Sequence, residues 1–457
     1  KVMIFNKNYF EPLSDYTVSW ELLENGVPVQ KGTGLLSDVN LGPGEISSVN
    51  LGPGEISSVN LGPEEIGSVN LGPRKSGEYM IPYDTSLLKP EAEYFVNVFF
   101  GLESDKPWAE SGYVQMAEQL PVKKGERYSL TEVSGVTPEC VQTDSLICIT
   151  GKDFKVTFNR LTGALCGLVY SGKDMISQGS ELELDAFRAY MNNDAWIYED
   201  WFANGLYNLK HKATSCDIST TPDGKQIISF AVESRAPRGG KMKGGNGNSK
   251  GIYSIDEIDS KPFGPEDFKF TTYQTWTVYP DGSIELNSKI DSNNHELVLP
   301  RLGYSVAIPS ELENYTYYGR GPEENYNDRK TGQFIGRYTS TVADQYTEYT
   351  RPQSNGNREE VRWSALTDST GDGGVFIAPD LMSATCIPYS EMELFEANHP
   401  YKLKDDNKNI LHLDVGMTGL GGASCGQGGP LEQDRVTAGP HRFSLIIRPL
   451  KAFSMPL

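Results

Sequence analysis

The sequence of 457 residues contains no long hydrophobic run and has a deficit of basic residues. A membrane-spanning helix needs about 20 consecutive apolar residues. No stretch approaches that length, so no membrane association is expected. The 41 lysines and arginines are outnumbered by 61 acidic residues, which leaves a net charge of −20. Because such a surface repels phosphate backbones, nucleic acid is not expected as a partner.

Cysteines are also few. The six cysteines are scattered, and none forms a Cys-x-x-Cys pair. This spacing argues against a zinc site and against a dense disulfide framework. We therefore expect buried free thiols and predict no metal site, although hard cations that use backbone carbonyls leave no motif. The redox compartment stays open.

Stretches with helical periodicity are scarce, whereas the chain has 47 glycines, 27 prolines and 24 tyrosines. This composition is typical of a turn-rich β protein. Apolar and polar residues alternate over 154–158, before a turn at Thr162-Gly163. They alternate again over 275–279, before a turn at Asp281-Gly282. Both patterns predict β-hairpins, and we predict an all-β chain.

Residues 1–121 read as a small β domain. Runs rich in β-branched and aromatic residues predict strands over 16–22 and 94–100. A segment of this length and pattern favours an immunoglobulin-like sandwich. We expect Trp20 and Trp108 to be core or interface anchors.

An internal repeat interrupts this domain. The residues Val-Asn-Leu-Gly-Pro recur every ten positions, beginning at Val39, Val49, Val59 and Val69. Each unit pairs a candidate strand with a turn, so the repeat (about residues 37–76) predicts added hairpins or a loose loop rather than a solenoid. We expect a tolerated surface insertion, and partner contact is the alternative.

Residues 122–457 follow a linker at 121–125 and predict one large, two-layer antiparallel sandwich. The stretch 236–264 is rich in Gly, Lys, Asn and Asp, which indicates a flexible surface loop.

The densest polar stretch of the chain begins at Tyr317. Its Gly319-x-Gly321-Pro322 opening forbids a continuous helix or central strand. Carboxylates, guanidinium groups, amides and phenols follow, as either a sugar-facing loop or a buried structural network requires. The residues concerned are Arg320, Glu323, Glu324, Asn325, Tyr326, Asp328, Arg329 and Arg358.

The order of these residues resembles a known family. The pattern Tyr-x-Gly-x-Gly-Pro-x-Glu-Asn-Tyr-x-Asp-Arg ends at Arg329, and Asp344-x-Tyr346 and Tyr-x-x-Pro-x-x-x-Gly-x-Arg follow it. It resembles the C-terminal small chain domain of glycoside hydrolase family 2 β-galactosidases. Further landmarks match at Phe187-Arg188-Ala189, Pro300-Arg301-x-Gly303 and 419–422. The resemblance implies that 1–121 is the family's sandwich domain and that 122–457 is a galactose-mutarotase-like supersandwich.

The resemblance also implies a role. In this family two carboxylates of a (β/α)₈ barrel hydrolyse terminal β-galactosides with retention. This sequence nowhere alternates strand and helix eight times, so we predict no catalytic residue in it. We expect a non-catalytic C-terminal portion that begins at Lys1 as a piece of something larger. It would brace the enzyme's own barrel and N-terminal domains, shape the active-site rim, bind carbohydrate and support a homo-oligomer of the whole enzyme. No cofactor is expected in this chain, whereas the whole enzyme is expected to use Mg or Na.

The resemblance places a few positions near the substrate. Some members follow Gly-Gly with a tryptophan that stacks on the sugar, but residues 421–428 contain no aromatic residue, which suggests a changed or more open site. The candidates for the substrate rim are Asn193, Asp194, Trp196, Cys425 and Gly426.

Other interpretations stay open. Glu323, Glu324 and Asp328 could form a site of their own, but ion pairs with Arg320 and Arg329 are the simpler reading. A stand-alone carbohydrate-binding or small-subunit module is the main alternative. A mutarotase-type enzyme would need a His/Glu pair converging in one cleft, and the five histidines fall in no matching context. Sugar specificity, oligomeric state and compartment (bacterial, periplasmic or cytoplasmic) are not identified.

Overall fold

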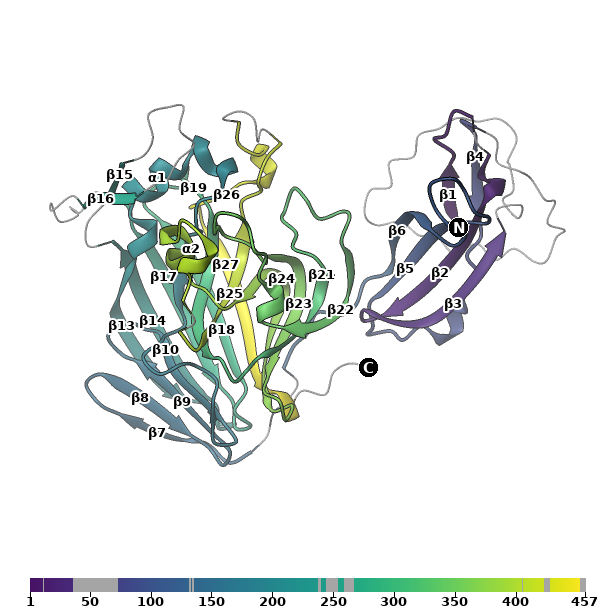
Figure 1. Ribbon diagram of the computed structural model, residues 1–457. Coiled ribbons are helices and arrows are strands. Elements are labelled where there is room, and N and C mark those ends of the chain that lie inside the picture. Colours follow the sequence, from purple (N-terminus) through teal and green to yellow (C-terminus); the bar gives the residue numbers. More distant parts are fainter. Residues whose placement is uncertain are drawn as a thin grey trace. The chain divides into compact units, whose positions relative to one another are not determined.

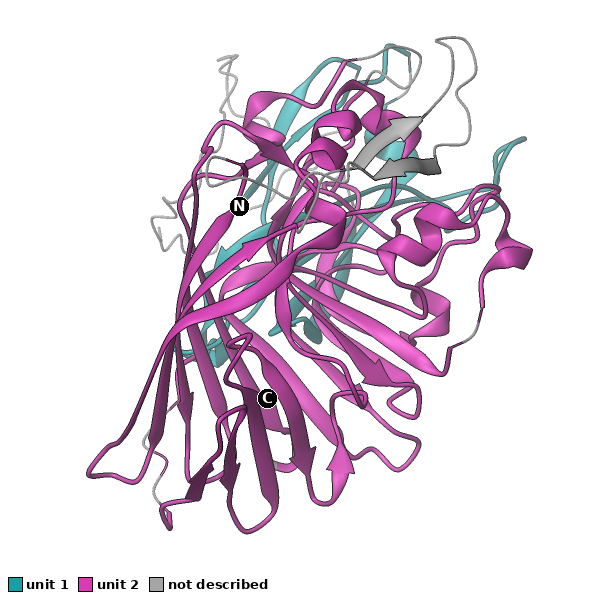
Figure 2. Cartoon of the chain, turned by 90° about the vertical axis from the view of Figure 1, so that its left-hand side faces the viewer, with its two compact units in different colours: residues 1–126, 456–457 teal, residues 127–455 magenta. Residues whose placement is uncertain are grey.

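The computed structural model describes most of the chain as two compact units, one from residues 1–126 and one from residues 127–455 (Figure 2). The described residues are 1–10, 12–35, 73–130, 133, 135–236, 240–243, 254–258, 267–404, 406–422 and 428–452. Nearly all of the ten-residue repeat, together with Cys425 and Gly426, lies outside them.

The smaller unit packs two antiparallel sheets around one core. One sheet pairs β1 (Val2–Phe5) with β4 (Ser76–Tyr79), and the other has the order β3 (Val27–Leu35), β2 (Tyr16–Glu24), β5 (Tyr94–Leu102), β6 (Val114–Lys123). The turn between β2 and β3 has positive φ at Asn25 (47°) and Gly26 (82°), as a two-residue hairpin requires. Trp20 is 4% exposed and belongs to the core. Trp108 is 58% exposed, so it is not a core residue, and its role as an interface anchor stays a prediction.

The larger unit contains a twelve-stranded antiparallel sheet. Its main path is β12 (Glu183–Asp185), β20 (Arg301–Pro309), β25 (Lys408–Met417), β24 (Gly373–Ile387), β27 (His441–Pro449), β18 (Ile284–Ser292), β17 (Phe270–Val278), β14 (Gln226–Arg235) and β13 (Lys210–Thr220). The strands β21 (Asn314–Gly321), β22 (Phe334–Thr341) and β23 (Arg358–Thr367) branch from β24.

A five-stranded sheet forms the second layer, with the order β11 (Lys173–Asp174), β10 (Leu165–Tyr170), β9 (Phe154–Asn159), β8 (Leu146–Thr150), β7 (Glu139–Gln142) (Figure 1). The two layers share one core, in which the rings of Phe158 on β9 and Trp276 on β17 lie 5.2 Å apart. The all-β prediction, a smaller sandwich followed by a large two-layer antiparallel domain, is confirmed.

Short elements complete the described chain. The strands β15 (Gly240–Lys243) and β16 (Ser254–Ile258) pair antiparallel within the stretch that was predicted as a flexible loop. Two further strands, β19 (Val298–Leu299) and β26 (Val436–Thr437), pair with each other. The helices are α1 (Tyr198–Ala203) and α2 (Glu391–Glu396), and the 3₁₀ turns are η1 (Leu13–Asp15), η3 (Thr85–Leu87), η4 (Asn192–Trp196), η5 (Leu206–Asn208), η6 (Ala343–Gln345), η7 (Pro400–Lys402), η8 (Glu432–Asp434) and η9 (Leu450–Ala452).

Candidate functional site

The loop after β21 holds the base of the glycine-rich loop at 419–422. The carboxylate of Asp328 accepts the backbone N–H groups of Leu420 (3.0 Å) and Gly421 (2.7 Å). Arg329 donates to the carbonyl oxygen of Gly421. A Cβ at Gly419 would lie 2.6 Å from Asp328 Cγ, so the close approach requires glycine there.

The predicted rim residues of η4 contact the same loop from the other side. Asn193 Nδ2 donates to the carbonyl oxygen of Leu420 at 3.0 Å. Trp196 lies under the guanidinium of Arg435, whose Cζ is 4.9 Å from the indole ring centre. Residues 193, 196, 328 and 329, predicted from separate motifs, thus all contact residues 420, 421 or 435. Asp194, by contrast, is buried.

Asp194 forms a bidentate ion pair with Arg188, with Arg188 Nη2 to Asp194 Oδ1 at 2.5 Å and Nε to Oδ2 at 3.2 Å. Both side chains are at most 1% exposed. Arg188 Nη1 also donates to the carbonyl oxygen of Thr418 at 2.5 Å, just before the glycine-rich loop. Such a buried, fully bonded pair positions backbone rather than binding a ligand.

Glu324 and Asn325 are enclosed by hydrogen bonds within the polar stretch. The Glu324 carboxylate accepts from Tyr326 Oη (3.0 Å), from the Gly356 amide (2.8 Å) and from Tyr349 Oη. Asn325 is fully buried, and its amide group bonds to the backbone at both ends of this loop. Arg358 Nε donates to Tyr317 Oη at 3.0 Å.

The predicted pairing of the loop's own charges is wrong. Arg320 lies 3.1 Å from Glu360 and donates to the carbonyl oxygens of 330 and 333, while Arg329 bonds to the backbone of Gly421. Glu323 is exposed. The partners come from other parts of the chain, because the loop folds against β23 and the glycine-rich loop rather than onto itself.

A cleft of about 600 Å³ opens on one face of the strands β12, β20 and β25. Glu183 is opposite Ser305, which is opposite His412, so the three side chains form a row across neighbouring strands. Asp185 lies on the same face of β12 as Glu183, since side chains alternate along a strand. The Nδ1 atom of His412 is 3.1 Å from Asp185 Oδ2. Glu391 on α2 also lines the cleft.

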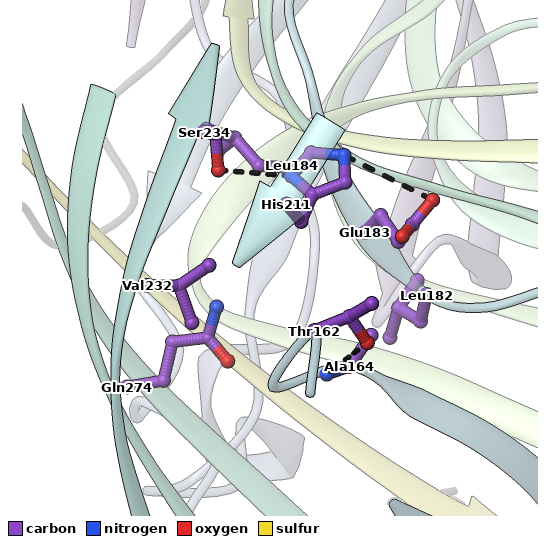
Figure 3. Close-up of a pocket in the computed structure, with 9 residues that line it drawn as sticks. All are labelled: Thr162, Ala164, Leu182, Glu183, Leu184, His211, Val232, Ser234 and Gln274. Atoms are coloured by element: carbon purple, nitrogen blue, oxygen red, sulfur yellow. Dashed lines mark hydrogen bonds and ion pairs between the residues drawn. The ribbon is translucent and has the colours of Figure 1, made fainter. Parts of the chain in front are cut away.

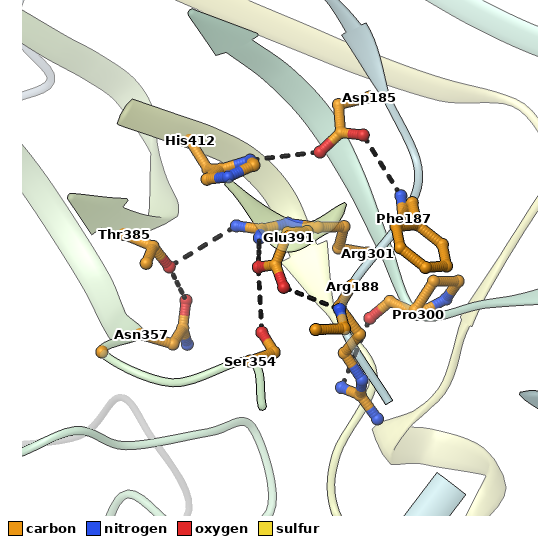
Figure 4. A network of polar contacts seen from close by, with 12 residues as sticks. Asp185, Phe187, Arg188, Pro300, Arg301, Ser354, Asn357, Thr385, Glu391 and His412 are labelled. Atoms are coloured by element: carbon orange, nitrogen blue, oxygen red, sulfur yellow. Dashed lines mark hydrogen bonds and ion pairs between the residues drawn. The ribbon is translucent and has the colours of Figure 1, made fainter. Parts of the chain in front are cut away.

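Arg301 belongs to a network of polar contacts that includes Glu391, which lines this cleft (Figure 4). Its guanidinium is fully buried and bonds to Glu391 (2.7 Å) and Asp414 (2.5 Å). Burial opposes its charge, but the two carboxylates outweigh burial and raise the pKa of Arg301. Glu391 also accepts from Ser354 Oγ (2.9 Å) and from the Ala189 amide (2.7 Å), which fixes the start of α2.

The pKa values of the side chains around the cleft are shifted. Burial, with help from Glu181, raises the pKa of Glu183 to about 7. Burial opposes ionisation of Asp185 as well, but His412 and Arg301 outweigh it and lower the pKa of that carboxyl. His211, 3.9 Å from Glu183 and bonded to Ser234 Oγ at 2.8 Å, has a pKa lowered by burial to about 4. Glu183 and His211 also line a cavity of only about 10 Å³ (Figure 3).

The sequence interpretation missed this cleft. The structure brings the pair of His412 and Asp185 to it, whereas the histidines matched no known context in the sequence. One signal was present: residues 181–185 read Glu-Leu-Glu-Leu-Asp, which places every acidic residue on one face of a strand. The partners on β20 and β25 lie more than 100 residues away and left no such signal.

Two classes of feature are absent from the described part of the chain. No group of three or more His, Cys, Asp or Glu side chains there could hold a metal ion. Nor does any helix in those same residues have the length and apolar character needed to cross a bilayer.

Comparisons with known proteins agree with the predicted family. Residues 150–447 match the family described as beta galactosidase small chain, and residues 2–123 match beta-galactosidase, domain 4. The beta-galactosidase of Halalkalibacterium halodurans is 27% identical over 373 residues, which are 79% of this chain and 33% of that protein. That of Priestia megaterium is 24% identical over 431 residues, which are 92% of this chain and 35% of that protein.

Among solved structures, galactose 1-epimerase from Lactobacillus acidophilus NCFM is similar over 69% of this chain and 98% of its own, with 8% identity and a TM-score of 0.37. The chain spans about a third of the length of the curated relatives it matches. Since the small chain family covers residues 150–447, well over half of the sequence, this chain belongs to the β-galactosidase small chain family.

Proposed function

We propose that this chain is the non-catalytic C-terminal portion of a β-galactosidase that cleaves terminal β-galactosides with retention. The observation that supports this proposal is that the chain matches domain 4 and the small chain of that enzyme, in that order. It covers about a third of the length of the relatives it matches. The catalytic carboxylates then belong to a barrel outside these residues, and that barrel is the main partner of this chain. Homo-oligomers of the whole enzyme are part of the same proposal.

The geometry of the rim supports a shaping role. Both carboxylate oxygens of Glu324, and both of Asp328, accept hydrogen bonds from the protein. A retaining glycosidase needs one carboxylate free to attack and a second to exchange protons, about 5–5.5 Å apart. Carboxylates that accept from backbone amides are suited to hold a loop instead, and Asp328 holds the loop 419–422 in this way. We propose that this loop forms part of the rim around the galactoside.

The test is complementation. This chain, alone and in place of the matched third of the Halalkalibacterium halodurans β-galactosidase, is assayed with o-nitrophenyl β-galactoside. We expect no hydrolysis by the chain alone and hydrolysis by the chimera. Robust turnover by the isolated chain would contradict the non-catalytic role and would point to Glu323, Glu324 and Asp328 as an active site. An inactive, folded chimera would contradict the assignment to this enzyme.

The rim is tested in the same chimera with Asp328→Ala. Loss of two charge-assisted hydrogen bonds, each of about 1.5–3 kcal/mol, should loosen 419–422 and lower kcat/KM by about tenfold or more. Asp344→Ala is the matched control, because that exposed carboxylate accepts only local bonds from Thr341. Equal kinetics for the two variants would refute a rim role for this loop.

A further inference from the structure

The cleft beside β20 is hollow because that strand carries small side chains where its neighbours carry large polar ones. Ser305 and Ala307, two residues apart and therefore on one face, both line it. Glu183 and His412 stand on either side of Ser305 in the strand register. A volume of about 600 Å³ is within the range of small-molecule sites.

Polar atoms converge on this hollow from three strands. His412 is only 4% exposed, and its Nδ1 atom lies 3.1 Å from Asp185 Oδ2, so the imidazole and the carboxylate are paired within the lining of the cleft. Glu181 is already held by Asn159 (2.7 Å) and Thr162 (2.6 Å). The lining therefore presents hydroxyl, carboxyl and imidazole groups, which can form hydrogen bonds with the hydroxyl groups of a sugar.

Apolar side chains lie among these groups. Phe187, Met392 and Ile410 line the same cleft. The Phe187 ring is held edge to face against Phe202, with ring centres 5.4 Å apart, so the position of this apolar surface is fixed by the protein. A pyranose ring has the matching character, with C–H groups on its faces and hydroxyl groups around its edge.

The charges select against other ligand classes. Glu181, Glu183 and Asp185 repel an anion, and the described residues contain no group suited to a metal ion. Glu183 has a pKa raised by burial to about 7, so near neutral pH its carboxyl both donates to and accepts from hydroxyl groups.

We propose that this cleft binds one neutral monosaccharide in its pyranose form. The site shares no lining residue with the rim, and the proposal rests on the carbohydrate-binding part of the proposed function, which it makes specific. Glu183, Asp185 and His412 hold the hydroxyl groups, and Phe187 and Met392 contact the apolar face of the ring.

The test is calorimetric titration of the full 457-residue chain with D-galactose, D-glucose and D-glucuronate. We expect one site for the neutral sugars, with a dissociation constant on the order of millimolar, and at least tenfold weaker binding of glucuronate. Ser305→Leu fills the hollow and should weaken binding at least tenfold. Ser219→Leu, at an exposed position of β13, is the matched control.

Glu183→Ala, with the exposed Glu199→Ala as its control, provides a second variant if Ser305→Leu does not fold. The proposal is overturned if no neutral sugar binds at 100 mM, if glucuronate binds equally well, or if both cleft variants bind as the parent does. Loss of binding in Asp328→Ala but not in Ser305→Leu would place the sugar at the rim and also overturn it. Because titration needs no hydrolysis, binding without complementation contradicts only the galactosidase role, and complementation without binding contradicts only this site.

Discussion

Replacing Glu359 by glutamine should make the larger unit more stable at alkaline pH. Glu359 is 7% exposed on β23, directly beneath the polar stretch, where its amide donates to Asn325 Oδ1 at 2.9 Å. Its Oε1 accepts from Asn357 Nδ2 (2.8 Å) and Ser383 Oγ (2.9 Å). Glutamine keeps an oxygen for these two donors and removes the charge.

The magnitude follows from the pKa of this carboxyl. Burial raises the pKa of Glu359 from 4.5 to about 7, although Ser383 and Asn357 oppose the shift. Because the folded protein holds the proton more tightly than the unfolded chain, the stabilisation is complete below pH 4.5 and is lost as the pH rises through 7. The difference between the two pKa values corresponds to about 3 kcal/mol. Glu359→Gln should therefore match the parent near pH 4.5 and exceed its unfolding free energy by up to about 3 kcal/mol at pH 8.

The assay is urea unfolding followed by tryptophan fluorescence between pH 4.5 and pH 8. Four of the six tryptophans, at 196, 201, 276 and 363, report on the larger unit. Glu360→Gln is the adjacent control with the opposite sign. Burial opposes ionisation of Glu360, but Arg320 and Lys330 outweigh it and lower its pKa, so its contribution is present above pH 4.5 and is lost as the pH falls. A stability difference for Glu359→Gln that does not change with pH would refute the reasoning.

Two further predictions concern the core of the larger unit. Arg301→Met leaves the carboxylates of Glu391 and Asp414 buried without their cation, which should destabilise the folded protein by about 3–5 kcal/mol. Calorimetry should then show a lower Tm. A Tm equal to that of the exposed control Arg442→Met would contradict this prediction. Burial raises the pKa of the Cys386 thiol, so iodoacetamide should leave Cys386 unmodified in the folded protein and alkylate it in urea, as read by peptide mass spectrometry. Rapid alkylation of the native protein would contradict this burial.

Local features of the fold were predictable because they depend on neighbouring residues. The alternation over 275–279 and the turn at Asp281-Gly282 correspond to the hairpin of β17 and β18. Because side chains alternate with a period of two, one face of a strand lies in the core. Gly282 adopts the positive φ of 85° that the turn requires. The family motif likewise lies within one short stretch.

Side-chain partners were not predictable in the same way. Arg320 was expected to pair within its own loop, but Glu360 on β23 is its partner. Asp328 holds amides about 92 residues further along the chain. Nothing in the local sequence indicates which distant segment will lie opposite a charged group, since that depends on how the strands are ordered in the sheet.

The sequence by itself determined the all-β class, the hairpins and the family, because each of these is written in short-range patterns of residue type. The tertiary structure alone decided where the polar groups meet. It placed Glu183, Ser305 and His412 side by side, although their strands are far apart in the chain. The small Ser305 therefore lies between two larger side chains. A cleft is a property of strand order and side-chain size taken together, and only the folded sheet combines the two.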